Sequence, residues 1–184
     1  MLKKNFALGE IFRIAFPVER IKTTLIEGND IPYVASKKAN NGVQQMCSTS
    51  NIPAEHILEG NCIVFVQRGN GAAGTTTYQP HDFYATKTLC CGYIDGVLNE
   101  NIALYLMAIL DKNRTLYNHE TPWTGKRLEE TPLPLPVKVD KDGDPIKVDG
   151  EYLPDWDYMD EFIEEIKQET YKKLIEHLNK EFAA

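Results

Sequence analysis

The stretch "IVFVQRGNGAAGTTTYQP" (residues 63–80) places an apolar run before Gly69, Gly71 and Gly74, which have the spacing of a dinucleotide-binding loop. Asp95 even lies about 20 residues further on, where that fingerprint wants a ribose ligand. The fingerprint also requires a helix directly after the last glycine, so that its N-terminus faces the pyrophosphate. Here "TTTYQ" follows, and β-branched residues favour a strand. The stretch therefore predicts strand, glycine turn, strand, and the nucleotide-binding enzyme becomes the least favoured alternative.

The segments around this stretch predict a β-rich unit with one buried helix. Short β-type runs occur in "FALGEIFRIAF", "DIPYVAS", "NCIVFVQ" and "FYATKTLCCGYI", with turn signals between them. "LNENIALYLMAILDKN" has the apolar content of a helix packed on a sheet, with Asn99 as its N-cap. The prolines of "TPLPLPV" then enforce an extended segment. We expect an α+β fold, with this domain over residues 1–153.

A polar hairpin is expected at about residues 136–150, with "DKDGD" as its turn. Asp140, Asp142, Asp144 and Glu151 fall at positions of a calcium-binding loop. Pro145 stands where that loop needs glycine, however, so a hairpin turn is favoured over a metal site.

Residues 154–184 have the pattern of one long coiled-coil-like helix. A helix of this length, about 40 Å, is too long to lie wholly on a domain of this size. Its stripe therefore predicts a partner helix, from a second copy or from another protein, while packing on its own domain would cover the first two turns. The residues expected to face that partner are Met159, Phe162, Ile163, Ile166, Leu174 and Leu178.

The net charge of −7 is unevenly distributed. Residues 1–128 hold 13 Lys and Arg against 11 Asp and Glu, whereas residues 129–184 hold 7 against 16. An acidic tail thus hides a slightly basic body, on which a positive face can exist. With no signal peptide and no run of the roughly 18 apolar residues that a membrane span needs, we expect a cytoplasmic protein.

Side chains for catalysis or metal binding are sparse. The four cysteines have no C-x-x-C spacing and are expected to be buried free thiols. The four histidines have no metal-ligand spacing, and the serines have no nucleophile-elbow context. We therefore expect no catalytic site, no metal and no cofactor in this chain.

Three polar loops carry side chains that suit DNA. Arg and Lys match guanine edges and phosphates, whereas Asn and Gln match adenine. Taken alone, each loop is more often a solvated turn. The residues expected to contact DNA are Lys37, Lys38, Asn40, Asn41, Gln44, Gln45, Arg68, Asn70, Lys126 and Arg127. Among them, Arg68 and Lys126 are expected on phosphates, and Asn41 and Gln44 on bases.

The order of these segments resembles a target-recognition domain of the specificity subunits of type I restriction-modification systems, and of the related type IIB subunits. The resemblance rests on "LGEIF", "DIPYVASKKANNG", "IVFVQRGNGAAG", "YQPHDFYAT", "YLMAIL", "GKRL", "PLPLPV" and "PDWDYMDEFI", in this order along nearly the whole chain. It implies a non-catalytic subunit that binds double-stranded DNA. Recognition loops vary within the family, so the base-reading residues carry over only as loop regions.

The resemblance also implies partners. A specificity subunit directs a DNA adenine methyltransferase, which would hold S-adenosylmethionine, and can recruit a restriction subunit. Full subunits usually contain two recognition domains and two long helices, whereas this chain has one of each, as in a half-subunit or a fragment. A half-subunit would form a homodimer through antiparallel helices and read a bipartite site. An anti-restriction or interaction module that mimics half of a specificity subunit is the main alternative.

Overall fold

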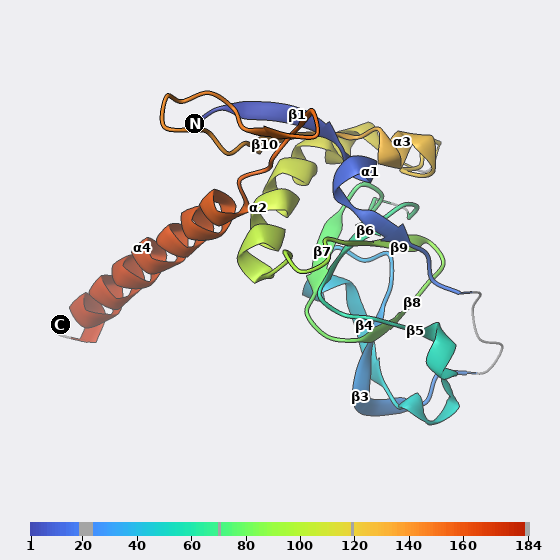
Figure 1. Ribbon diagram of the computed structural model, residues 1–184. Coiled ribbons are helices and arrows are strands. Elements are labelled where there is room, and N and C mark those ends of the chain that lie inside the picture. The colour runs from blue at the N-terminus through green and yellow to red at the C-terminus, as the bar shows by residue number, and fades with distance from the viewer. Residues whose placement is uncertain (19–23, 70, 119, 183–184) are drawn as a thin grey trace.

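The computed structural model describes residues 1–18, 24–69, 71–118 and 120–182. Two four-stranded sheets and one helix, α2 (Glu100–Leu110), form the body, and α4 (Trp156–Phe182) projects from it (Figure 1). The expected α+β class with a long C-terminal helix is confirmed.

The first sheet runs through the middle of the molecule. Its strands are, in spatial order, β2 (Arg13–Ala15), β9 (Leu89–Tyr93), β6 (Cys62–Val66) and β7 (Thr76–Gln79), all antiparallel. Ile63 and Phe65 on one face of β6 pack toward α2, whereas Val64 and Val66 on the other face pack toward the second sheet. Every residue of β6 and β9 is buried because both faces are covered. This explains the continuous apolar run "IVFV", since a half-exposed strand would alternate.

The second sheet lies below the first in Figure 1. Its strands are, in spatial order, β4 (Val43–Cys47), β3 (Glu27–Val34), β8 (Phe83–Ala85) and β5 (Ile57–Leu58), of which β3 and β8 run parallel. The connections include the short 3-10 helices η1 (Asn40–Gly42), η2 (Thr49–Asn51) and η3 (Ala54–His56). Phe83 and Val34 contribute to the core between the two sheets.

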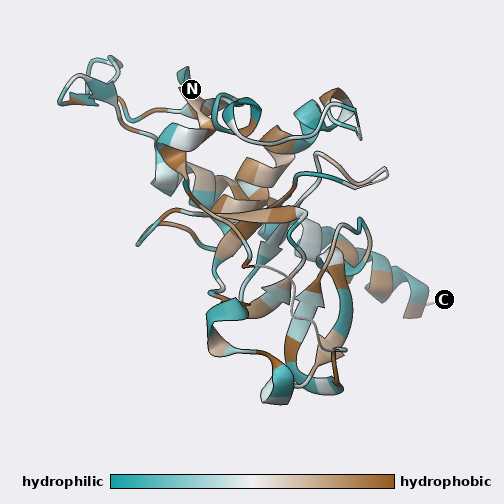
Figure 2. Cartoon of the chain, turned by 90° about the vertical axis from the view of Figure 1, so that its right-hand side faces the viewer, coloured by the Kyte–Doolittle hydropathy of each residue, from teal (hydrophilic) through white to brown (hydrophobic). Residues whose placement is uncertain are grey.

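Helix α2 covers the outer face of the first sheet, as expected. Asn99 is its N-cap, and its Oδ1 accepts a hydrogen bond from the backbone N–H of Ile102 at 2.9 Å. A further 3-10 helix, η4 (Asp111–Leu116), continues the chain. Trp123 lies fully buried beside this layer, and its indole N–H donates to Thr131 Oγ1 at 2.8 Å. In Figure 2 the apolar colours gather in these central elements.

The N-terminal segment differs from the expected single β-type run. It forms β1 (Lys3–Ala7), one helical turn α1 (Leu8–Ile11), and then β2. The turn is closed because the Glu10 carboxylate accepts a bond from the Ala7 N–H at 2.7 Å. Gly92 on β9 lies so close to this turn that an added Cβ would stand 2.7 Å from Phe12 Cδ1.

The expected extended segment "TPLPLPV" contains β10 (Pro132–Pro136), which follows the short helix α3 (Lys126–Glu129) and pairs with β1. Prolines recur at every second position, whereas Leu133 and Leu135 point into the core. Because proline cannot donate a bond, the pairs of these two leucines with β1 must carry the ladder, and the prolines face the other edge, where Pro136 O accepts from the Asp155 N–H at 2.9 Å.

The polar hairpin forms as two successive turns. The Asp140 carboxylate accepts backbone bonds from Asp142 and Asp144 at 2.9 and 3.0 Å, which makes the turn expected at "DKDGD". The second turn follows along the chain and joins two short antiparallel strands, β11 (Lys147–Val148) and β12 (Glu151–Tyr152).

The four cysteines are free and buried, as expected. Burial raises the pKa of the Cys90 thiol to about 12, so this thiol stays protonated at neutral pH.

Helix α4 begins on the body and leaves it. Asn99 and Asn101 donate amide bonds to Asp160 and Glu164 at 3.1 and 3.4 Å, and Lys167 pairs with Glu100 at 3.0 Å. Contact with the start of α2 therefore continues to about the third turn of α4, one turn further than expected from the sequence. Among the described helices, none has the length and apolar character to cross a membrane.

The buried start of α4 corrects part of the expected partner stripe. Met159 is 0 % exposed within the core of its own domain, so it is unavailable to another chain. Phe162 packs edge-on against Tyr105 of α2, with ring centroids 5.8 Å apart, and Ile163 also packs on the core. Phe162, despite this contact, and Ile166, Leu174 and Leu178 remain exposed. The apolar stripe of α4 thus has two parts. Its first turns pack into the core of this domain, and its later turns leave apolar side chains exposed.

Candidate nucleic-acid interface

Four chain segments meet where β6 ends, and they enclose a pocket of about 350 Å³. The segments are the end of β2, the start of the glycine turn, the β8–β9 connection, and the approach to α3. The lining residues are Phe16, Gln67, Arg68, Lys87, Thr88, Thr124 and Gly125.

Backbone hydrogen bonds hold these segments together. The N–H groups of Gln67 and Arg68 both donate to Thr88 O, at 3.0 and 3.3 Å. The Trp123 N–H donates to Gln67 O at 3.0 Å, which ties the approach to α3 onto the end of β6. The pocket is thus built from distant parts of the sequence on a rigid frame.

Ser36 joins the first polar loop to the same place. Its hydroxyl donates to Arg68 O at 2.8 Å and lies 2.7 Å from the Thr88 hydroxyl oxygen. The contact is close, because a Cβ added at Gly69 would lie 2.9 Å from Ser36 Cβ. Lys37 and Lys38 follow and are exposed. All three polar loops singled out in the sequence therefore approach this pocket.

The pocket lining is positively charged. Arg68 and Lys87 are its charged residues, both exposed, and the other lining residues are neutral. Across the described parts of the chain, neither side chain forms a hydrogen bond or an ion pair with a protein group. Such a surface attracts anions, and phosphates of DNA are bound in this way by Lys and Arg.

The two asparagines of the first loop have structural roles. Asn40 and Asn41 both have positive φ, at 53° and 50°. Asn41 Nδ2 donates to Tyr78 O at 2.7 Å, and Asn41 O accepts from Gln79 Nε2 at 2.8 Å, so the turn is fastened to β7. One N–H of the Asn41 amide is thus engaged by β7, so this residue has a structural role beside the base contact expected of it. Asn40 Nδ2 likewise donates within the turn, to Val43 O at 3.2 Å.

The glutamines of this loop lie on β4. Gln44 is exposed, and the described structure gives its side chain no protein hydrogen bond. Gln45 is also exposed, but its Nε2 lies 3.5 Å from Cys47 Sγ. Gln44 is therefore the freer of the two side chains for a base edge.

The two cationic side chains of α3 differ in how firmly they are bound to other protein groups. Arg127 Nη1 donates to Pro122 O at 2.8 Å and so helps to hold the approach to this helix. Lys126 is strongly exposed beside Glu130, with 3.4 Å between Nζ and the carboxylate oxygen. A surface pair of this kind is weak, so Lys126 can exchange Glu130 for another anion. Asn70, the remaining candidate, lies outside the described residues.

The sequence did not point to three residues of this pocket, namely Phe16, Lys87 and Thr88, whereas Thr124 belongs to one of the polar loops. Phe16 falls at the end of a β-type run, and Lys87 sits within "FYATKTL", which suggested only strand. Phe16 is nevertheless 57 % exposed. A lysine between two threonines in an otherwise apolar stretch was the available signal for Lys87.

The glycine turn itself connects two strands. Gly74 N donates to Val66 O and Val66 N donates to Thr75 O, both at 2.9 Å, so β6 and β7 form a hairpin. Gly71 and Gly74 have φ of 71° and 81°, which the turn needs. The predicted strand after the glycines is confirmed, and β7 stands where a dinucleotide-binding loop requires a helix.

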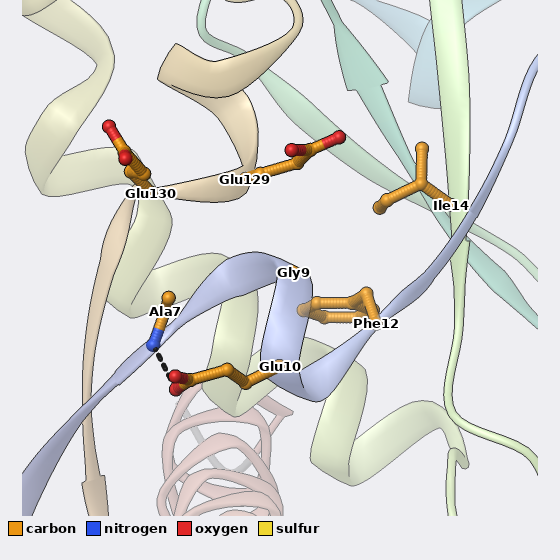
Figure 3. Close-up of a pocket in the computed structure, with 7 residues that line it drawn as sticks. All are labelled: Ala7, Gly9, Glu10, Phe12, Ile14, Glu129 and Glu130. Atoms are coloured by element: carbon orange, nitrogen blue, oxygen red, sulfur yellow. Dashed lines mark hydrogen bonds between the residues drawn. The ribbon is translucent and has the colours of Figure 1, made fainter.

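A second pocket, of about 500 Å³, has the opposite charge. Figure 3 shows Glu10 of α1, and Glu129 and Glu130 at α3, around a floor that includes Phe12 and Ile14. Glu10 is already engaged with the backbone of its own turn. Phosphates are repelled by such a wall, so this second pocket is unsuited to a DNA backbone. Within the described ranges, no group of three His, Cys, Asp or Glu side chains could hold a metal ion.

The sequence and the fold both have known counterparts. Residues 2–177 match the family model described as the type I restriction modification DNA specificity domain. The chain is 26% identical over 147 residues to the Type II restriction enzyme BgcI specificity subunit S.BcgI of Heyndrickxia coagulans, which covers 79% of this chain and 38% of that protein.

Two solved structures share the fold. One is the HsdS subunit from Thermoanaerobacter tengcongensis, with a TM-score of 0.57 and 15% identity over 92% of this chain and 38% of that one. The other is the S subunit of a type I restriction-modification system from M. genitalium, with a TM-score of 0.56 and 15% identity over 97% and 43%. The chain thus spans less than half the length of each of these relatives.

Proposed function

The chain belongs to the family of type I restriction-modification DNA specificity domains, and we propose that it recognises a DNA sequence for a restriction-modification complex. The observation that carries this proposal is the convergence of three polar loops on one positively charged pocket. Its role is recognition, and the chemistry belongs to partners. A DNA adenine methyltransferase with bound S-adenosylmethionine would flip and methylate the base, and a restriction subunit would join the assembly for cleavage.

The free part of α4 supports pairing with a second helix. Apolar side chains remain exposed on an otherwise charged helix, and such stripes are typical of coiled-coil partners. These side chains are Ile166, Tyr171, Leu174, Ile175, Leu178 and Phe182. We infer that a second copy supplies the partner, antiparallel, so that the two recognition domains face away from each other.

A two-fold dimer would read a bipartite site with an unread spacer. The 27 residues of α4 span about 40 Å at 1.5 Å per residue, which is comparable with the roughly 34–36 Å of one turn of duplex DNA. The helix would therefore act as the spacer between the two half-sites.

The function is tested by mapping methylated bases across the genome of cells that express this chain with its cognate methyltransferase. We expect a bipartite motif with methylated adenines that disappears when this chain is omitted. Methylation without any sequence motif, or a motif that persists without this chain, would refute the proposal.

Self-pairing is tested separately by light scattering. The Leu174→Ser/Leu178→Ser double variant should shift the chain from dimer to monomer without unfolding it, because both side chains are exposed. Glu176→Gln, an exposed position on the opposite side of the helix, is the matched control and should remain dimeric. A wild-type chain that stays monomeric at high concentration would assign the stripe to a helix of another protein.

A further inference from the structure

We propose that the pocket at the end of β6 is a phosphate clamp, in which Arg68 and Lys87 hold one backbone phosphate of DNA and Phe16 covers the adjoining deoxyribose. The inference rests on the proposed DNA-recognition function and deepens it. It names a site, and a residue, Lys87, that the sequence did not suggest.

The charges select an anion. Arg68 and Lys87 line the pocket from two different segments, and the rest of the lining brings no carboxylate. Over the described residues, both side chains lack a protein partner, whereas Arg13 and Lys138 are each paired with an aspartate. Two unpaired cations converging on one cavity leave their charge to be balanced by a ligand.

The shape and the apolar wall favour a nucleotide unit over a small free anion. A volume of about 350 Å³ is several times what a bare phosphate needs. Phe16 adds an apolar, 57 % exposed surface next to the cations. A phosphodiester presents a negative charge next to an apolar sugar, and hydroxyls such as that of Thr124 also bond phosphate oxygens.

The clamp is linked to the loop expected to meet the bases. Ser36, whose hydroxyl donates to Arg68 O at 2.8 Å, stands directly before Lys37 and Lys38. Gln44 belongs to the same polar loop and lies at the start of β4. A phosphate held by Arg68 and Lys87 would thus determine how the segment 37–45 approaches the groove. Phosphate contacts position a protein on DNA, whereas base contacts specify sequence.

The clamp predicts a sequence-independent loss of DNA affinity. For the Arg68→Gln/Lys87→Gln double variant, the slope of log K against log salt should fall by about 0.9, and affinity at 0.1 M salt should drop roughly eightfold, from the counterion-release exponent for one phosphate contact. Lys87→Gln alone should lower both the slope and the affinity by less, because Arg68 still holds the phosphate. Arg68→Gln should behave in the same way. Lys141→Gln, an exposed lysine of the polar hairpin, is the matched control.

The measurement is fluorescence anisotropy of the full-length chain with a labelled duplex, over a salt series, with circular dichroism to confirm that each variant is folded. If Lys87→Gln matches Lys141→Gln in both affinity and slope, the clamp is refuted while DNA recognition stands. A methylation motif altered by Lys87→Gln would also overturn it, since a phosphate contact carries no sequence information. If the wild-type chain binds no DNA, alone or with its methyltransferase, the proposed function fails and the clamp fails with it.

Discussion

Asn41 offers the sharpest test of how the first polar loop works. The residue has a φ of 50°, and its amide donates to Tyr78 O at 2.7 Å. We expect Asn41→Ala to remove this bond and to place an ordinary side chain in the left-handed region. Asn41→Gly removes the bond but tolerates the backbone conformation.

The two variants differ in the size of the expected loss. One hydrogen bond contributes about 1 kcal/mol net, and a left-handed conformation costs an ordinary residue about 1–2 kcal/mol. Asn41→Ala should therefore lower the free energy of unfolding by about 2–3 kcal/mol, and Asn41→Gly by only about 1 kcal/mol. The exposed, unbonded Gln44→Ala should change it by less than about 0.5 kcal/mol.

The assay is equilibrium unfolding in urea at 25 °C, followed by methylome mapping of the same variants. Equal stability of Asn41→Ala and Asn41→Gly would refute the backbone argument, and wild-type stability for both would refute the structural role of the amide. We expect the methylation motif to survive Asn41→Gly and to change with Gln44→Ala. A motif changed by a stably folded Asn41→Gly would restore this side chain as a base reader.

Met159→Ala should destabilise the chain by about 2–5 kcal/mol because it empties a filled core position, whereas Leu178→Ala should leave unfolding nearly unchanged and weaken self-association, as measured by urea unfolding and light scattering. Cys90, whose pKa burial raises to about 12, should react with iodoacetamide at pH 8 only in denaturant; rapid labelling of the folded chain, read by mass spectrometry, would contradict this. The hydrogen bond from Arg13 lowers the pKa of Asp95, so the stabilising contribution of this pair is present at neutral pH and is lost as the pH falls through the folded-state pKa. NMR titration of Arg13→Gln should show the Asp95 pKa rising toward its ordinary value, and an unchanged pKa would contradict the assignment.

One surface of helix α4 packs on α2 and another remains exposed, and the packed surface affects the geometry of any assembly that α4 forms. The first three turns are joined to α2 by a polar network that includes Asn99 with Asp160 and Lys167 with Glu100. This network sets the direction in which α4 leaves the domain (Figure 1). If a second helix pairs with the free part, the angle between the two recognition domains is determined by these contacts. A truncation that tests dimerisation should therefore keep residues up to 168.

Local patterns determined most of the fold. The apolar run of β6, the threonine-rich strand after the glycines, the capped helix α2 and the long 3.6-residue stripe of α4 are each encoded within a few turns of chain. The ordered motifs were likewise sufficient to identify the family. The exception is "LGEI", where one carboxylate closing on the Ala7 N–H converted a β-type run into a helical turn.

Only the tertiary structure decided which side chains are available and which lie together. Ser36, Arg68 and Thr88 are far apart in the sequence but share hydrogen bonds, and their meeting brings Lys87 beside Arg68 in one pocket. Asn41 matches a base-reading residue by type, yet β7 engages one N–H of its amide. Met159 fits the helical stripe, yet the docking of α4 on α2 buries it. Sequence periodicity specifies conformation and face, whereas the distance between segments depends on the path of the whole chain.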